Sequence, residues 1–64
     1  MKYREGDIVR ISKKCDYYGR NSFNPRDIDG EVVEIDWRDT IKVEWENGNN
    51  SWYREEHLKL RKRA

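Results

Sequence analysis

Two side chains of the types used in catalysis and metal binding occur once each in this 64-residue chain, His57 and Cys15. Their loops have no evident reason to meet, and no third residue is placed to orient either one. Asp27 and Asp29 flank Ile28 in a turn-like stretch, which favours capping of the backbone over acid–base chemistry. The four glycines are scattered, so no glycine-rich loop is available to hold a phosphate group. The sequence therefore predicts a protein that is not an enzyme and uses neither a metal nor a cofactor.

Aromatic side chains outside a core are better candidates for function, because they anchor protein partners. Trp52 and Tyr53 are neighbours on one expected strand, so one must point into the core and the other outward. A two-residue Asn-Gly turn before this strand would bury Trp52, whereas a loop one residue longer would bury Tyr53. The candidate residues for binding a protein partner are Tyr17, Tyr18, Trp37, Trp52 and His57.

Trp37 lies in the expected turn over residues 36–39, where a large ring is unusual. The alternation Val33, Ile35, Trp37 favours a ring that folds back over the preceding strand as a lid. The other interpretation is a ring that projects as an anchor for a partner. Trp45, in a cleanly alternating strand, is expected in the core.

Charged residues make up 42% of the chain but nearly cancel, leaving a net charge of +1. This balance argues against a globally basic nucleic-acid-binding protein. The distribution is uneven: residues 29–56 hold three Lys/Arg against nine Asp/Glu, and residues 57–64 hold four Lys/Arg and no acid. The acidic members of the middle segment that would oppose nucleic acid are Asp29, Glu31, Glu34, Asp36, Asp39, Glu44 and Glu46.

A basic patch forms if the first strand pairs with the last, and it is the basis of an alternative function in nucleic-acid binding. Its candidate residues are Arg10, Lys13, Lys14, Arg20, Lys59, Arg61, Lys62 and Arg63. The competing interpretation of the tail is a solvated chain end.

Length and composition predict one small domain over residues 1–60 with a frayed basic tail over 61–64. Eight of its residues are aromatic, so a few large rings must supply much of the core. A single cysteine excludes an intramolecular disulfide, and no apolar run of about 18 residues is present. We therefore expect a cytoplasmic protein, and Met1 suggests a complete small gene product.

The expected elements are all β apart from one helical turn. Strands are predicted over residues 8–12, 30–35, 40–45, 50–53 and 58–60, with a 3₁₀ turn over residues 54–57. The adjacent valines Val32 and Val33 predict a bulge, and Asn47-Gly48 predicts a type I′ hairpin turn. Residues 13–29 form a long loop, which is typical of a functional segment and in which Phe23 is the expected anchor.

This order, together with the segments GDIVRI, GEVVEI, VEWENG, SWYR and HLKL, resembles the five-stranded SH3-like small β-barrel. The detail is similar to the Mind bomb-type barrel repeat and to short phage-encoded proteins, although Ser51 stands where that pattern usually has Asn. The resemblance implies a core Tyr53, an exposed Trp52, and a ligand groove between the long loop and the 3₁₀ turn. It also implies a phage accessory protein that engages a host factor.

The leading hypothesis is thus a monomeric, non-enzymatic SH3-like barrel that binds another protein. The first alternative is a nucleic-acid-binding barrel similar to KOW-type domains, which share the G-D-x-V and G-x-V-x-E-I strand patterns. The second is a small structural component or a homodimer joined through an unpaired strand edge.

Overall fold

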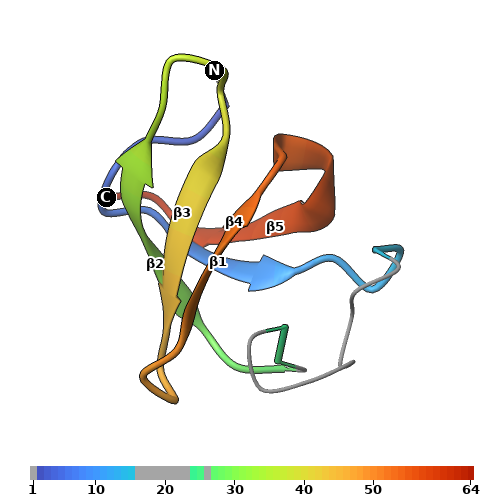
Figure 1. The fold of residues 1–64 in the computed structure, drawn as a ribbon. Coiled ribbons are helices and arrows are strands. Elements are labelled where there is room, and N and C mark those ends of the chain that lie inside the picture. Colours follow the sequence, from blue (N-terminus) through green and yellow to red (C-terminus); the bar gives the residue numbers. More distant parts are fainter. Residues whose placement is uncertain (1, 16–23, 26) are drawn as a thin grey trace.

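The computed structural model describes residues 2–15, 24–25 and 27–64. Its strands are β1 (Ile8–Ile11), β2 (Gly30–Ile35), β3 (Ile41–Trp45), β4 (Asn50–Tyr53) and β5 (Leu58–Lys62). They form one antiparallel sheet in the order β4-β3-β2-β1-β5, with the 3₁₀ turn η1 (Glu55–His57) between β4 and β5 (Figure 1). The predicted all-β class and element order are confirmed. The expectations for Tyr17, Tyr18, Arg20 and Phe23 lie outside the described residues.

One face of the sheet forms the core, because alternate residues of each strand point to it. In β3 the inward residues are Ile41, Val43 and Trp45, of which none is more than 2% exposed. The other buried hydrophobic residues of the described chain are Tyr3, Val9, Ile11, Cys15, Val32, Tyr53 and Leu58, with Ile28, Ile35 and Leu60 packed against them. Large rings thus fill much of the core, as the composition predicts.

Gly30 is required where β2 passes under the ring of Trp45. The two residues are cross-strand partners, and a Cβ on Gly30 would lie 2.5 Å from both Trp45 Cε3 and Val43 Cγ1. Such a contact is far inside van der Waals distance. The missing side chain therefore makes the space into which the Trp45 indole packs.

The β3–β4 turn differs from the predicted type I′ turn. Only Gly48 has a positive φ, at 89°, and the paired residues are Trp45 and Asn49, joined by the Trp45 N–H donating to the Asn49 carbonyl at 2.7 Å. A three-residue loop with glycine in the left-handed region is the alternative to the type I′ turn. The longer loop sets the register, pairs Ile41 with Tyr53, and buries Tyr53.

The predicted bulge in β2 is confirmed, because the register with β3 shifts between Val32 and Glu34. Val32 is fully buried, whereas Val33 is 37% exposed. The inserted residue thus allows two adjacent valines to occupy one strand, with only the first of them in the core.

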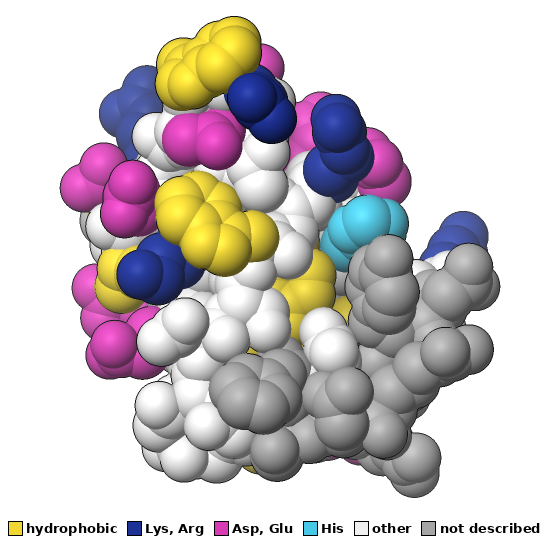
Figure 2. All heavy atoms as spheres, in the orientation of Figure 1, with side chains coloured by type: hydrophobic (Ala, Val, Ile, Leu, Met, Phe, Trp, Pro, Cys, Tyr) yellow, Lys and Arg dark blue, Asp and Glu magenta, His cyan; other side chains and the backbone are white. Residues whose placement is uncertain are grey.

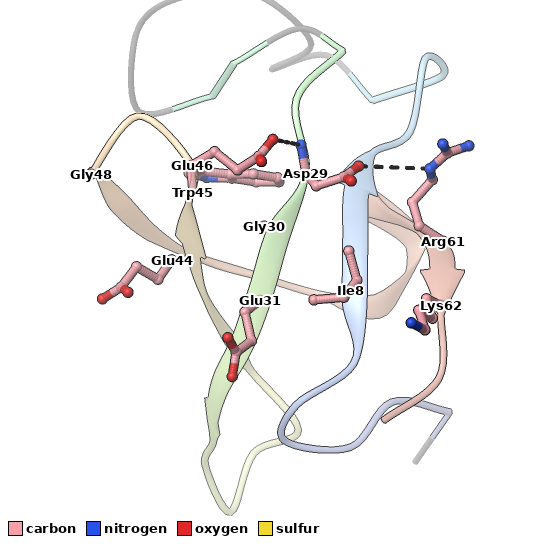
Figure 3. Close-up of a pocket in the computed structure, with 10 residues that line it drawn as sticks. All are labelled: Ile8, Asp29, Gly30, Glu31, Glu44, Trp45, Glu46, Gly48, Arg61 and Lys62. Carbon is pink, nitrogen blue, oxygen red and sulfur yellow. Dashed lines mark hydrogen bonds and ion pairs between the residues drawn. The ribbon is translucent and has the colours of Figure 1, made fainter.

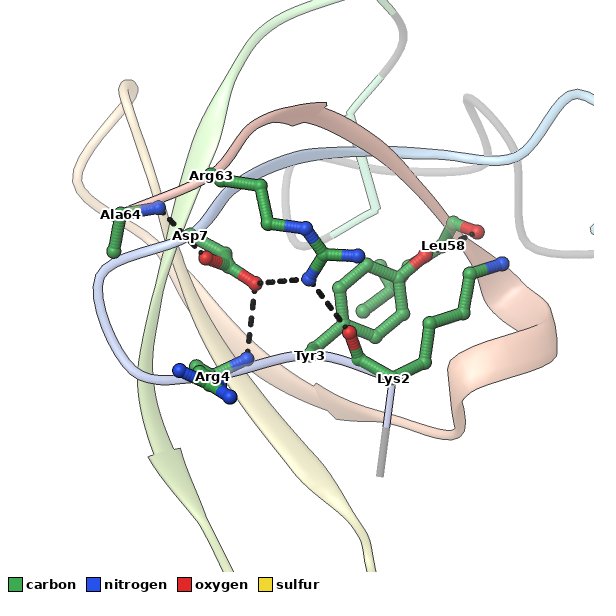
Figure 4. A network of polar contacts seen from close by, with 7 residues as sticks. All are labelled: Lys2, Tyr3, Arg4, Asp7, Leu58, Arg63 and Ala64. Carbon is green, nitrogen blue, oxygen red and sulfur yellow. Dashed lines mark hydrogen bonds and ion pairs between the residues drawn. The ribbon is translucent and has the colours of Figure 1, made fainter.

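The last strand is longer than predicted, because it includes residues 61–62 of the expected frayed tail. Strand β5 continues to Lys62, and the Ala64 N–H donates to Oδ1 of Asp7 over 2.8 Å. Asp7 is only 1% exposed, and its other oxygen accepts the Arg4 N–H at 2.9 Å and lies 3.6 Å from Nη1 of Arg63 (Figure 4). These backbone donors, that of Ala64 first, lower the pKa of Asp7 below its ordinary value. A buried carboxylate therefore fastens the tail to the N-terminal segment.

The aromatic residue nearest the N-terminus, Tyr3, strengthens this connection from the core side. It is 1% exposed, and its hydroxyl donates to the Leu58 carbonyl at 3.1 Å. Burial raises the pKa of this phenol.

The described residues contain no helix whose length and hydropathy would let it span a membrane.

Candidate functional site

The exposed hydrophobic residues of the described chain gather on β2, the β2–β3 turn and β4. They are Val33, Trp37 and Trp52, exposed by 37%, 84% and 44%. Figure 2 shows hydrophobic side chains emerging among acidic and basic ones on one face of the molecule. We call the surface formed by Val33, Trp37, Lys42 and Trp52 the aromatic face.

Trp37 is held outward by a turn with fixed hydrogen bonds. Oδ1 of Asp36 accepts the backbone N–H groups of Arg38 and Thr40, both at 2.9 Å, and Asp39 takes a left-handed φ of 61°. The Trp37 ring is 84% exposed, and Cζ of Arg38 lies 4.7 Å from the ring centroid. The predicted lid over β2 is therefore wrong, because the turn directs this indole into solvent.

Trp52 stands on the outer side of β4, opposite the buried Tyr53. Its cross-strand partner is Lys42, and the Lys42 Nζ lies 5.8 Å from the centroid of the indole ring. A cation over an exposed ring contributes about 0.5–1 kcal/mol, which restrains the side chain without covering it. The predicted orientation of Trp52 is confirmed.

His57 lies at the end of η1, beside the end of β1. It is half-buried, its Nδ1 accepts the Arg54 N–H at 3.4 Å, and its carbonyl accepts the Ser12 N–H at 2.9 Å. The structure therefore places His57 where it joins η1 to the end of β1. The groove expected between His57 and the tyrosines of the long loop involves residues outside the described ranges.

Cys15 is buried, at 8% exposure, and belongs to the core cluster. This placement removes the thiol from the surface. Among the described residues, no group of three or more His, Cys, Asp or Glu side chains is placed to hold a metal ion.

A groove of about 680 Å³ runs over β1, β2, β3 and β5 (Figure 3). Ile8 and Gly30 line it together with acidic residues from β2, β3 and the adjoining loops and two cations from β5. Its charged residues are Asp29, Glu31, Glu44, Glu46, Arg61 and Lys62. The mixture of charges matches no single class of ligand.

Asp29 connects this groove to the basic edge of the sheet. Its Oδ1 accepts Nε of Arg10 at 2.7 Å and lies 3.6 Å from Nε of Arg61, while its own N–H donates to Glu46 at 3.0 Å. The hydrogen bond to Asp29 raises the pKa of Arg10. The predicted capping role of Asp29 is wrong, because the carboxylate binds guanidinium groups instead.

The structure brings most of the predicted basic residues together, because β1 does pair with β5. Arg10, Lys13, Lys14, Lys59 and Arg61 line one hollow. Lys62 lines the groove beside it, Arg63 pairs with Asp7, and Arg20 lies outside the described residues. Sequence reasoning missed Lys2 as a member of this hollow, since only the fold shows that the N-terminal segment runs beside β5.

Comparisons of the chain with protein-family models, with curated proteins and with solved structures gave no match. Function therefore has to be inferred from the surfaces described above.

Proposed function

We propose that this protein is a non-enzymatic, monomeric SH3-like small barrel that binds another protein through its aromatic face. The observation that carries the proposal is the 84% exposure of Trp37 on a turn that is rigidly hydrogen-bonded. A large ring contributes to folding only when it is buried. An exposed indole adds little to folding, and its apolar surface is buried only when a partner covers it.

The order of elements supports the SH3-like barrel. Residues 12–29 separate β1 from the meander β2-β3-β4, η1 follows, and β5 returns antiparallel to β1. The Tyr53 hydroxyl donates to Asn24 at 2.8 Å, so this residue of the segment between β1 and β2 is held against β4. These features agree with the resemblance seen in the sequence, from which we also infer a phage accessory protein acting on a host factor.

The side chains around the aromatic face indicate the chemistry of the partner. The acidic residues on β2, β3 and the turn between them are Glu31, Glu34, Asp36, Asp39 and Glu44, against the cations Arg38 and Lys42. Both cations already stack on the indoles. The fitting partner surface is therefore an apolar pocket with a basic rim.

The two indoles are far enough apart to act as separate anchors. Trp37 lies on the β2–β3 turn, whereas Trp52 lies on β4 opposite Lys42, which in turn pairs with Glu34 of β2. Two tryptophan anchors on neighbouring elements fit within one interface of ordinary size. Truncation of each should cost about 2 kcal/mol or more, which is roughly a 30-fold loss of affinity.

The experiment compares capture of proteins from a bacterial host lysate by the wild-type chain and by Trp37→Ala and Trp52→Ala. A supporting result is one host protein that is retained by the wild type and lost by both variants. Lys59→Ala, on the opposite part of the sheet, is the matched control and should retain it. Equal capture by all four proteins, with circular dichroism showing that each is folded, would refute the proposal.

A further inference from the structure

The hollow between β1 and β5 concentrates positive charge to a degree that the near-neutral sequence conceals. It measures about 530 Å³, and Ile11, Leu58 and Leu60 form its apolar lining. Its cationic residues are Lys2, Arg10, Lys13, Lys14, Lys59 and Arg61, and the only acid that lines it is Asp27. We call these six cations and their apolar lining the basic hollow.

Strand register places like charges directly opposite one another in this hollow. Arg10 and Lys59 are cross-strand partners in the β1–β5 pair. Like charges at such positions destabilise a sheet. Asp29 offsets part of this repulsion through Arg10 and Arg61, yet none of the three ion pairs in the described chain involves Lys13, Lys14 or Lys59. The arrangement therefore disfavours folding and suits a bound anion.

The acidic residues of the chain lie mainly on other strands. Six of them belong to β2, β3 and the β2–β3 and β3–β4 turns: Glu31, Glu34, Asp36, Asp39, Glu44 and Glu46. These acids argue against nucleic-acid binding in the sequence. None of the six lines the basic hollow, although Glu46 accepts the N–H of Asp29, which binds Arg10 and Arg61 at the edge of the hollow. A polyanion approaching β1 and β5 meets cations first, while the acidic side orients the molecule away from it.

We propose that the basic hollow binds the phosphate backbone of duplex nucleic acid without reading its bases. The four lysines of the hollow, which no ion pair among the described residues engages, can contact successive phosphates, whereas both guanidinium groups of the hollow are held by Asp29. The side chains that line the hollow include no aromatic ring, so they offer no platform on which single-stranded bases could stack. An acidic protein segment would need apolar contacts, and two of the three apolar residues of the hollow, Ile11 and Leu58, are only 4% and 5% exposed.

The binding is electrostatic and should depend steeply on salt. Contact of about four cations with phosphates gives a slope of log affinity against log salt concentration near −3.6. Affinities in the range of about 1–100 µM are expected at physiological salt, as for other sequence-independent contacts. Duplexes of different sequence should bind equally.

The experiment is fluorescence anisotropy of a short, labelled DNA duplex between about 50 and 200 mM salt. The double variant Lys14→Glu with Lys59→Glu should lose at least about tenfold in affinity, and its salt slope should fall by about 2. The matched control, Arg38→Glu with Lys42→Glu, makes the same charge change on the aromatic face and should alter affinity by less than about threefold.

The inference is overturned if the wild type does not bind the duplex at about 50 mM salt, or if both double variants lose affinity equally. Tighter binding of a glutamate-rich peptide than of the duplex would assign the hollow to a protein partner and also overturn it. If the double variant Lys14→Glu with Lys59→Glu does not fold, the neutral double variant Lys14→Gln with Lys59→Gln takes its place in the measurement. The variant Trp37→Ala leaves the hollow intact, so this variant should bind DNA as the wild type does. The DNA measurement is therefore independent of whether Trp37 binds a protein partner.

Discussion

Trp45 and Tyr53 meet edge to face in the core, with ring centroids 5.8 Å apart and ring planes at 78°. The Trp45 indole N–H donates to the Tyr53 hydroxyl at 3.2 Å, and that hydroxyl in turn donates to Asn24. Burial raises the pKa of Tyr53, since a phenolate would be poorly solvated there. This pair sets which side of β4 is inward and therefore sends Trp52 outward.

Tyr53→Phe should lower the free energy of unfolding by about 1–3 kcal/mol, because the buried Trp45 N–H loses its acceptor. Urea denaturation followed by circular dichroism measures the change. Trp52→Phe is the control, and its stability should stay within about 0.5 kcal/mol of the wild type. Equal stability of Tyr53→Phe and the wild type would show that the hydrogen bond is not formed.

Gly30→Ala should destabilise the protein by about 1–3 kcal/mol, because its methyl group would overlap Trp45 and Val43. Gly48→Ala provides a comparison, since nothing lies within 4 Å of its Cβ and only its φ of 89° opposes a side chain. That strain costs about 1 kcal/mol. Thermal unfolding of both variants should rank Gly30→Ala as the less stable, and the reverse order would contradict the packing of Trp45 over Gly30.

Asp7 should make stability fall in acid. Its folded-state pKa lies below the ordinary 3.8, so its contribution is fully present above that value and disappears as pH falls through the folded pKa. The wild type should therefore be more stable than Asp7→Asn at neutral pH, and the difference should shrink below about pH 4. Thermal melts at several pH values measure this, and a constant difference would show that the carboxylate charge is not involved.

Tryptophan fluorescence should separate the three indoles by exposure. Trp45 is 2% exposed, whereas Trp37 and Trp52 are 84% and 44% exposed. Acrylamide should therefore quench the wild type strongly and the double variant Trp37→Phe with Trp52→Phe weakly, and emission of the double variant should lie at shorter wavelength. Strong quenching of the double variant would mean that Trp45 is not in the core.

Short-range patterns predicted much of the fold. Alternation over residues 40–45 placed Ile41, Val43 and Trp45 inward, and the paired valines of β2 indicated the bulge. The type of the β3–β4 turn was not predictable from Asn47-Gly48, because the same pair suits two loop lengths that differ by one residue. The position of Tyr53 followed only from the resemblance to SH3-like barrels.

Contacts between distant segments account for what the sequence could not predict. The tail is ordered by Asp7, more than fifty residues earlier, and Asp29 binds arginines on two strands. Trp37 projects because Asp36 closes its own turn, a local bond that outweighs the alternation along β2. The pairings of Asp7 and Asp29, unlike the local bonds of Asp36, depend on the register of the whole sheet rather than on neighbouring residues.

The most direct test of the aromatic face is a titration of the ¹⁵N-labelled chain with the host protein captured from lysate. The three indole N–H signals report on three separate places, and that of Trp45 is an internal reference because it is buried and donates to Tyr53. The signals of Trp37 and Trp52 should shift while that of Trp45 stays. Unchanged Trp37 and Trp52 signals, with shifts confined to β1 and β5, would contradict binding through the aromatic face.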